Sequence, residues 1–154
     1  MTPFIFDTEV KCINLSAHFK LSEMIQSNTA LKLGIKNLPT RQEFMNMKAL
    51  CERRLEQLRS YVRCPVFISS GFRNKQLNAA VGGAENSYHT RGMAADIILP
   101  VRADVFRNLM WWSQNFTYDE LIICVRGKSD VWVHLAYDPT PHTPKQYFGV
   151  KGYR

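Results

Sequence analysis

The chain has 154 residues, and its 20 lysines and arginines exceed its 13 acidic residues, giving a net charge of +7. This length is typical of one domain with a hydrophobic core, and the 45% hydrophobic content argues against intrinsic disorder. No run of 18 apolar residues is present, which excludes a membrane-spanning helix. The first residues lack a basic segment followed by an apolar one, so we expect no secretory signal and synthesis in the cytoplasm.

The positive charge favours an anionic partner but leaves open nucleic acid, a membrane surface or an acidic cell-wall polymer. Nucleic acid could be bound by Arg53, Arg54 and Arg59, but a solvated helix face explains these residues more simply, so no nucleic-acid partner is expected. The four cysteines lack C-x-x-C spacing, and we expect them to be reduced. Cys51 and Cys124 fall in apolar patterns, where free thiols pack as small hydrophobes.

Helical patterns dominate the first 62 residues. After an extended start at Phe4-Ile5-Phe6, Ser22 can cap a short helix and a helical turn follows over residues 29–33. We expect residues 1–40 to pack as a helical segment on a single domain that spans residues 1–154. Thr40 and Glu43 form a capping box at the start of a long helix that ends near Val62.

Strand patterns dominate the rest of the chain. Apolar or alternating runs predict strands over 66–69, 93–99, 121–125 and 131–137, with an edge strand over 147–154. Helices are predicted over 75–81 and 105–113, the second with Phe106, Leu109 and Met110 facing inward, and a polar loop over 84–92. Helices followed by strands predict an α+β fold whose sheet is largely antiparallel.

Three side chains indicate a metal site. Asp96 lies within an apolar strand, where a carboxylate is costly to bury unless something neutralises it. His89 lies just upstream, and strand alternation lets His134 share a sheet face with Asp96. Two histidines and one carboxylate leave an open position on zinc, which is the composition of a hydrolytic site. Each residue also has an ordinary explanation: a core or surface histidine, or an ion pair of Asp96 with Arg73 or Arg91.

Four motifs resemble the zinc D-alanyl-D-alanine carboxypeptidase family. They are Ser69-Ser70-Gly71-Phe72-Arg73, Leu77-Asn78-x-x-Val81-Gly82-Gly83, Ser87-x-His89-x-x-Gly92-x-Ala94-x-Asp96 and Trp132-Val133-His134. The segment from Leu15 to Ala30 is similar to the N-terminal segment of small single-domain members. That family shares its fold with D-Ala-D-Ala dipeptidases, phage cell-wall endopeptidases and the hedgehog signalling domain.

The resemblance implies that His89, Asp96 and His134 bind Zn²⁺. It implies that Arg73 stabilises the substrate carbonyl and its oxyanion, and that Ser87 lines the substrate site. Relatives place an acidic general base three residues before the last histidine or at the end of the preceding strand, where this chain has Val131 and Cys124. We therefore predict Asp130 as the base if the hairpin turn bulges, with Glu120 and Asp119 as weaker alternatives.

The predicted function is that of a monomeric zinc peptidase that cleaves peptidoglycan stem peptides at the cell wall, as carboxypeptidase or endopeptidase and of a phage-lysin type. The missing acidic residue motivates an alternative, a non-catalytic zinc domain that binds the cell wall or a protein partner.

Overall fold

The computed structural model describes residues 9–154, so the predicted extended start at residues 4–6 lies outside the described part. Its helices are α1 (Leu21–Ile25), α2 (Asn28–Leu33), α3 (Arg41–Leu50), α4 (Glu56–Val62), α5 (Lys75–Ala80) and α6 (Ala103–Asn115). The strands are β1 (Phe67–Ser70), β2 (Ala94–Ile98), β3 (Glu120–Arg126), β4 (Asp130–Ala136) and β5 (Tyr147–Tyr153). Short 3₁₀ turns cover Val10–Cys12 and Tyr88–Arg91.

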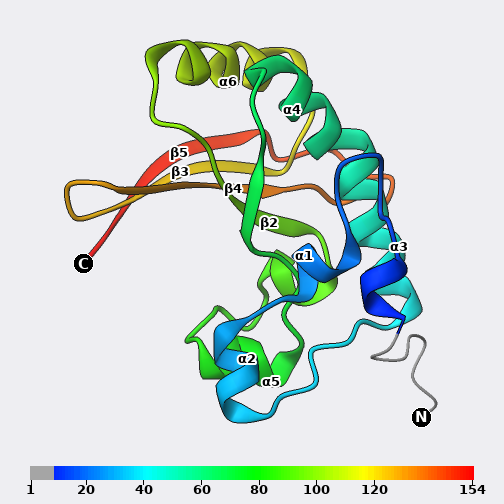
Figure 1. The fold of residues 1–154 in the computed structure, drawn as a ribbon. Coiled ribbons are helices and arrows are strands. Elements are labelled where there is room, and N and C mark those ends of the chain that lie inside the picture. Colours follow the sequence, from blue (N-terminus) through cyan, green and yellow to red (C-terminus); the bar gives the residue numbers. More distant parts are fainter. Residues whose placement is uncertain (1–8) are drawn as a thin grey trace.

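The five strands form one sheet in the order β1-β2-β4-β3-β5 (Figure 1). All neighbours are antiparallel except β3 and β5, which run parallel, so the sheet is mixed. The predicted α+β class and the largely antiparallel pairing are confirmed. The edge position of the last strand is also confirmed, while its parallel direction was not anticipated.

The predicted long helix is a continuous rod beside the sheet, in which a π-helical turn over Cys51–Leu55 joins α3 to α4 (Figure 1). Its start is the predicted capping box: Thr40 Oγ1 accepts from Glu43 N–H, and the Glu43 carboxylate accepts from Thr40 N–H. Buried side chains from this rod and α6 pack with one face of the sheet, including Leu58, Trp112, Ile97, Leu121 and Leu135. The opposite face carries Asp96 and His134, together with apolar residues such as Trp132.

The core-facing stripe of α6 differs from the prediction. Val105, Leu109 and Trp112 are buried, whereas Met110 is 38% exposed. The spacing of four and then three residues defines one helix face, and Met110 lies off that face. The prediction that Met110 faces inward was therefore wrong.

The N-terminal helices support the segment that follows β1. Gly71 lies so close to α1 that an added Cβ would be 2.4 Å from the Met24 carbonyl oxygen. Phe72 N–H donates to the same carbonyl (2.7 Å). The buried Asn37 amide donates to the Phe72 carbonyl (2.8 Å), and its oxygen accepts from Asn74 N–H (2.8 Å). The backbone on both sides of Arg73 is thereby fixed.

The four cysteines are free, with Cys51 and Cys124 buried as the apolar patterns predicted. Among the described helices, none combines the length and apolar character needed to cross a membrane.

Candidate metal centre

Two adjacent strands bring Asp96 and His134 together. β2 and β4 pair antiparallel with Asp96 directly opposite His134, so both side chains lie on the sheet face away from the core. His134 Nδ1 is 2.9 Å from Asp96 Oδ1. The predicted shared face is thus present in the register of the sheet.

His89 reaches the same carboxylate from outside the sheet. The predicted polar loop forms a 3₁₀ turn, Tyr88–Arg91, which holds the imidazole 2% exposed. His89 Nδ1 is 2.7 Å from the Gly71 carbonyl oxygen, which can only accept, so Nδ1 carries a hydrogen and Nε2 is the ring nitrogen that faces Asp96. Nε2 lies 3.3 Å from Asp96 Oδ1.

A glycine allows the chain to turn between these two residues. Gly92 ends the 3₁₀ turn with φ +71°, in the left-handed region. An added Cβ would be 2.5 Å from the Glu43 carbonyl oxygen of α3. Both the backbone conformation and the close approach of α3 therefore require glycine at this position.

The three donors form a set that suits a divalent transition metal. One ligand atom each from His89, Asp96 and His134 lies within 4.8 Å of the others. Two imidazole nitrogens and one carboxylate oxygen are ligands of catalytic zinc sites, which keep a further position open. The backbone carbonyl behind His89 fixes its tautomer, as expected for a ligating histidine.

In the metal-free site, the hydrogen bonds among these residues shift the pKa values of Asp96 and His134. Burial opposes ionisation of Asp96, but hydrogen bonds from His134 and His89 hold its pKa well below the usual range. Burial alone would lower the pKa of His134, but its bonds to Asp96 and Glu120 raise that pKa to about 9. In the metal-free protein, His134 is therefore mainly protonated at neutral pH.

We therefore expect Zn²⁺ binding to release about one proton per chain at about pH 7.5, because a ligating nitrogen must be unprotonated. The release should fall towards zero above pH 9, where His134 is already neutral. Calorimetric titration with Zn²⁺ in buffers of different ionisation enthalpy measures this number. Identical heats in all buffers at pH 7.5 would contradict the prediction.

Glu120 holds the outer nitrogen of His134. Glu120 is the first residue of β3, and its Oε2 lies 3.2 Å from His134 Nε2, on the ring nitrogen not facing Asp96. The bond to His134 lowers the pKa of Glu120 against the effect of burial. A carboxylate on the outer nitrogen orients a metal-binding histidine and increases its basicity. Glu120 is therefore placed as a positioning residue.

Glu120→Gln should lower the affinity for Zn²⁺ by about 10- to 100-fold, because the amide cannot supply the charge that holds the His134 ring. Competition with a chromophoric chelator measures the affinity. Glu85→Gln, which changes an exposed loop carboxylate, serves as the matched control. Equal affinities of the Glu120 variant and the wild-type protein would show that Glu120 does not support the centre.

Asp130, the predicted general base, lies far from His134. It begins β4 in regular register with Arg126 and forms an ion pair with that residue at 3.0 Å. Four residues of strand separate it from His134, about 13 Å at 3.3 Å per residue. The turn does not bulge towards the centre, so this placement does not support the base role predicted for Asp130.

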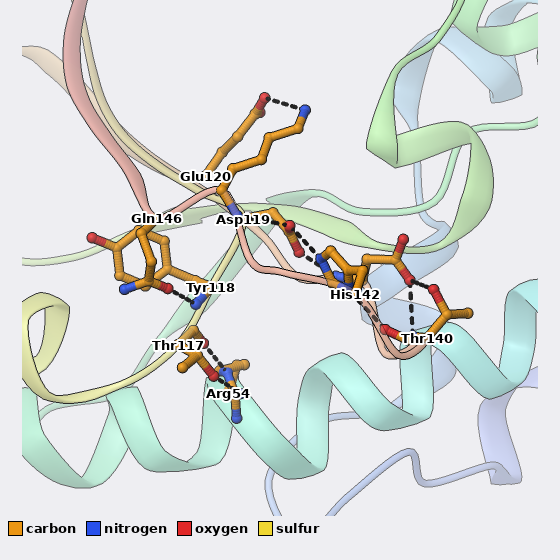
Figure 2. A network of polar contacts seen from close by, with 10 residues as sticks. Arg54, Thr117, Tyr118, Asp119, Glu120, Thr140, His142 and Gln146 are labelled. Carbon is orange, nitrogen blue, oxygen red and sulfur yellow. Dashed lines mark hydrogen bonds and ion pairs between the residues drawn. The ribbon is translucent and has the colours of Figure 1, made fainter.

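Asp119, the other alternative, has a structural position. Asp119 and Glu120 point in different directions (Figure 2), and it is Glu120 that contacts His134. The buried Asp119 carboxylate accepts from Asp138 N–H (2.7 Å) and lies 2.6 Å from His142 Nε2. It thereby anchors the loop between β4 and β5. The same loop places the Lys145 ammonium 3.9 Å from Glu120.

Arg73 and Ser87 both border the centre. Ser87 Oγ accepts from His89 N–H at 3.2 Å, so Ser87 supports the turn that carries the ligand. Arg73 N–H donates to the His89 carbonyl (3.1 Å), and burial lowers the pKa of the guanidinium while Asp96 opposes that shift. Neither arginine proposed as an ion-pair partner forms such a pair with Asp96: Arg91 instead stacks on the Tyr88 ring at 4.6 Å.

The family comparison agrees with this geometry. The profile of the family described as Peptidase M15 matches residues 17–136, more than half of the chain. The matched region contains His89, Asp96 and His134, and it ends where β4 ends. No curated protein was found to match the chain. The chain therefore belongs to the peptidase M15 family.

Proposed function

We propose that the protein is a zinc peptidase that hydrolyses peptidoglycan stem peptides, as a D-Ala-D-Ala carboxypeptidase or a cell-wall endopeptidase. The observation that carries this proposal is the convergence of His89, Asp96 and His134 on one sheet face beside Arg73. When bound, a zinc ion supplies Lewis-acid chemistry, which polarises the scissile carbonyl and activates water.

Residues of the chain perform the other tasks. Arg73 is a permanently charged donor that can bind the substrate carbonyl and the negative charge that develops on its oxygen. Nε of Arg73 is buried and, within residues 9–154, has no hydrogen-bond partner, so the guanidinium has an unused donor beside the site. The net charge of +7 favours residence on an anionic wall, consistent with an enzyme that acts there in the manner of a phage lysin.

A second candidate function is a non-catalytic zinc domain that binds the cell wall or a protein partner. Within residues 9–154, the carboxylates bonded to His89 and His134 are Asp96 and Glu120, and Glu120 is engaged on the outer nitrogen. Burial raises the pKa of Cys124, so this thiol stays neutral and is a poor proton acceptor. The site can thus hold a metal without a carboxylate free to act as the base.

The deciding experiment is hydrolysis of purified peptidoglycan by the protein stripped of metal and then supplied with Zn²⁺. New amino termini that appear only after Zn²⁺ is added support the peptidase. Asp130→Asn serves as a matched variant, which we expect to retain activity within about twofold because Asp130 is paired with Arg126. Stoichiometric Zn²⁺ binding without release of amino termini would support the second candidate.

A further inference from the structure

The last strand carries a side chain to the metal face. β5 pairs parallel with β3, and Tyr153 is in register with Arg126. Phe148 of β5 packs against the core, so by alternation Tyr153 lies on the opposite face, with His134. This strand lies outside the part of the chain that matches the family profile.

Tyr153 lies beside residues that flank the centre. Its ring is 5.1 Å from the ring of Trp132, which shares the sheet face of His134 two residues further along β4. Its phenol interacts with the thiol of Cys124, the strand neighbour of Trp132. Tyr153 remains 41% exposed, so part of its surface is open to a ligand.

Arg73 and Tyr153 come from opposite edges of the sheet. Arg73 follows the edge strand β1 and Tyr153 belongs to the edge strand β5, and the strands that carry Asp96 and His134 lie between them. The open face of the centre therefore lies between a cation from one edge of the sheet and a phenol from the other edge.

We propose that Tyr153 is a substrate-binding residue of this peptidase, whose ring and hydroxyl contact the peptide opposite Arg73. The inference rests on the proposed function. The Tyr153 ring, supported by Trp132, provides an amphipathic surface for a peptide backbone. Its hydroxyl is a hydrogen-bond donor that can reach a backbone carbonyl of the peptide to one side of the scissile bond.

Two substitutions separate the roles of the ring and the hydroxyl. Tyr153→Phe keeps the contact with Trp132 and removes the donor, so KM on a synthetic stem pentapeptide should rise about 2- to 10-fold with kcat nearly unchanged. Tyr153→Ala also removes the ring, so KM should rise by about a further tenfold. Tyr61→Phe, on α4 where the ring packs against Trp111, is the matched control and should remain within about twofold of wild type.

Direct binding of the pentapeptide to metal-free protein, followed by calorimetry, provides a readout independent of turnover. The inference expects weaker binding by Tyr153→Ala and wild-type binding by Tyr61→Phe. Wild-type kinetics and binding in both Tyr153 variants would overturn it and leave Tyr153 as a packing partner of Trp132. If the wild-type protein binds the peptide but does not cleave it after addition of Zn²⁺, the proposed function fails, and the binding data still decide on Tyr153.

Discussion

Replacing His134 with alanine should abolish both stoichiometric Zn²⁺ binding and peptide hydrolysis. His134 supplies one of three donor atoms and lies 2.9 Å from Asp96. Its loss leaves one imidazole and one carboxylate, too few ligands for a three-residue centre. Removing the imidazole also deprives the largely buried Asp96 of a hydrogen-bond partner, so the metal-free variant should be less stable than the metal-free wild type.

Elemental analysis after gel filtration measures the metal content, and release of amino termini from peptidoglycan measures activity. His18→Ala is a suitable control, because His18 is a half-exposed histidine paired with Glu56 of α4 and is not one of the three grouped donors. It should retain about one zinc per chain. Full zinc content in His134→Ala would overturn the assignment of the metal centre, since the remaining residues could not account for it.

The grouping of Asp96 and His134 could be anticipated from the sequence because it follows from local rules. A carboxylate in an apolar strand needs a partner, and the period-two alternation of strands assigns Asp96 and His134 to definite faces. The sheet then needs only to pair the two strands in the correct register. The observed pairing of Asp96 with His134 satisfies this condition directly.

The residues that hold His134 and Arg73 in place make long-range contacts, which local sequence patterns do not predict. Glu120 meets His134 diagonally, because β3 pairs with β4 so that Ile122 lies opposite His134. Asn37, in a loop more than 30 residues away, supports Arg73 because its side-chain amide bonds to the backbone of the residues on both sides of Arg73. Side-chain amides in loops carry no sequence signal for such distant partners.

The positions of Asp130 and Tyr153 relative to His134 also depend on long-range structure. Asp130 is close to His134 in sequence, but in an extended strand four residues correspond to about 13 Å. Tyr153 reaches the metal face only because β5 pairs parallel with β3. Parallel pairing joins strands through a long connection, so the strand direction cannot be inferred from a hairpin turn.

Replacing Arg73 with lysine should lower kcat on stem peptides by about 100-fold while Zn²⁺ content stays at the wild-type value. Lysine keeps the positive charge but lacks the planar fork of donors, so it cannot reproduce the directed hydrogen bonds of a guanidinium. The segment around Arg73 is fixed by Asn37 and by the bond to the His89 carbonyl, and the backbone should therefore not move to compensate.

Steady-state kinetics with elemental analysis separates this effect from loss of metal. Arg107→Lys changes an exposed arginine of α6, on the helical side of the molecule, and should leave kcat within about twofold of wild type. If Arg73→Lys instead raised KM at unchanged kcat, the guanidinium would contribute equally to ground-state and transition-state binding. The result therefore decides whether Arg73 acts on the developing oxyanion or only holds the peptide, because only the oxyanion role requires an interaction that strengthens during the reaction.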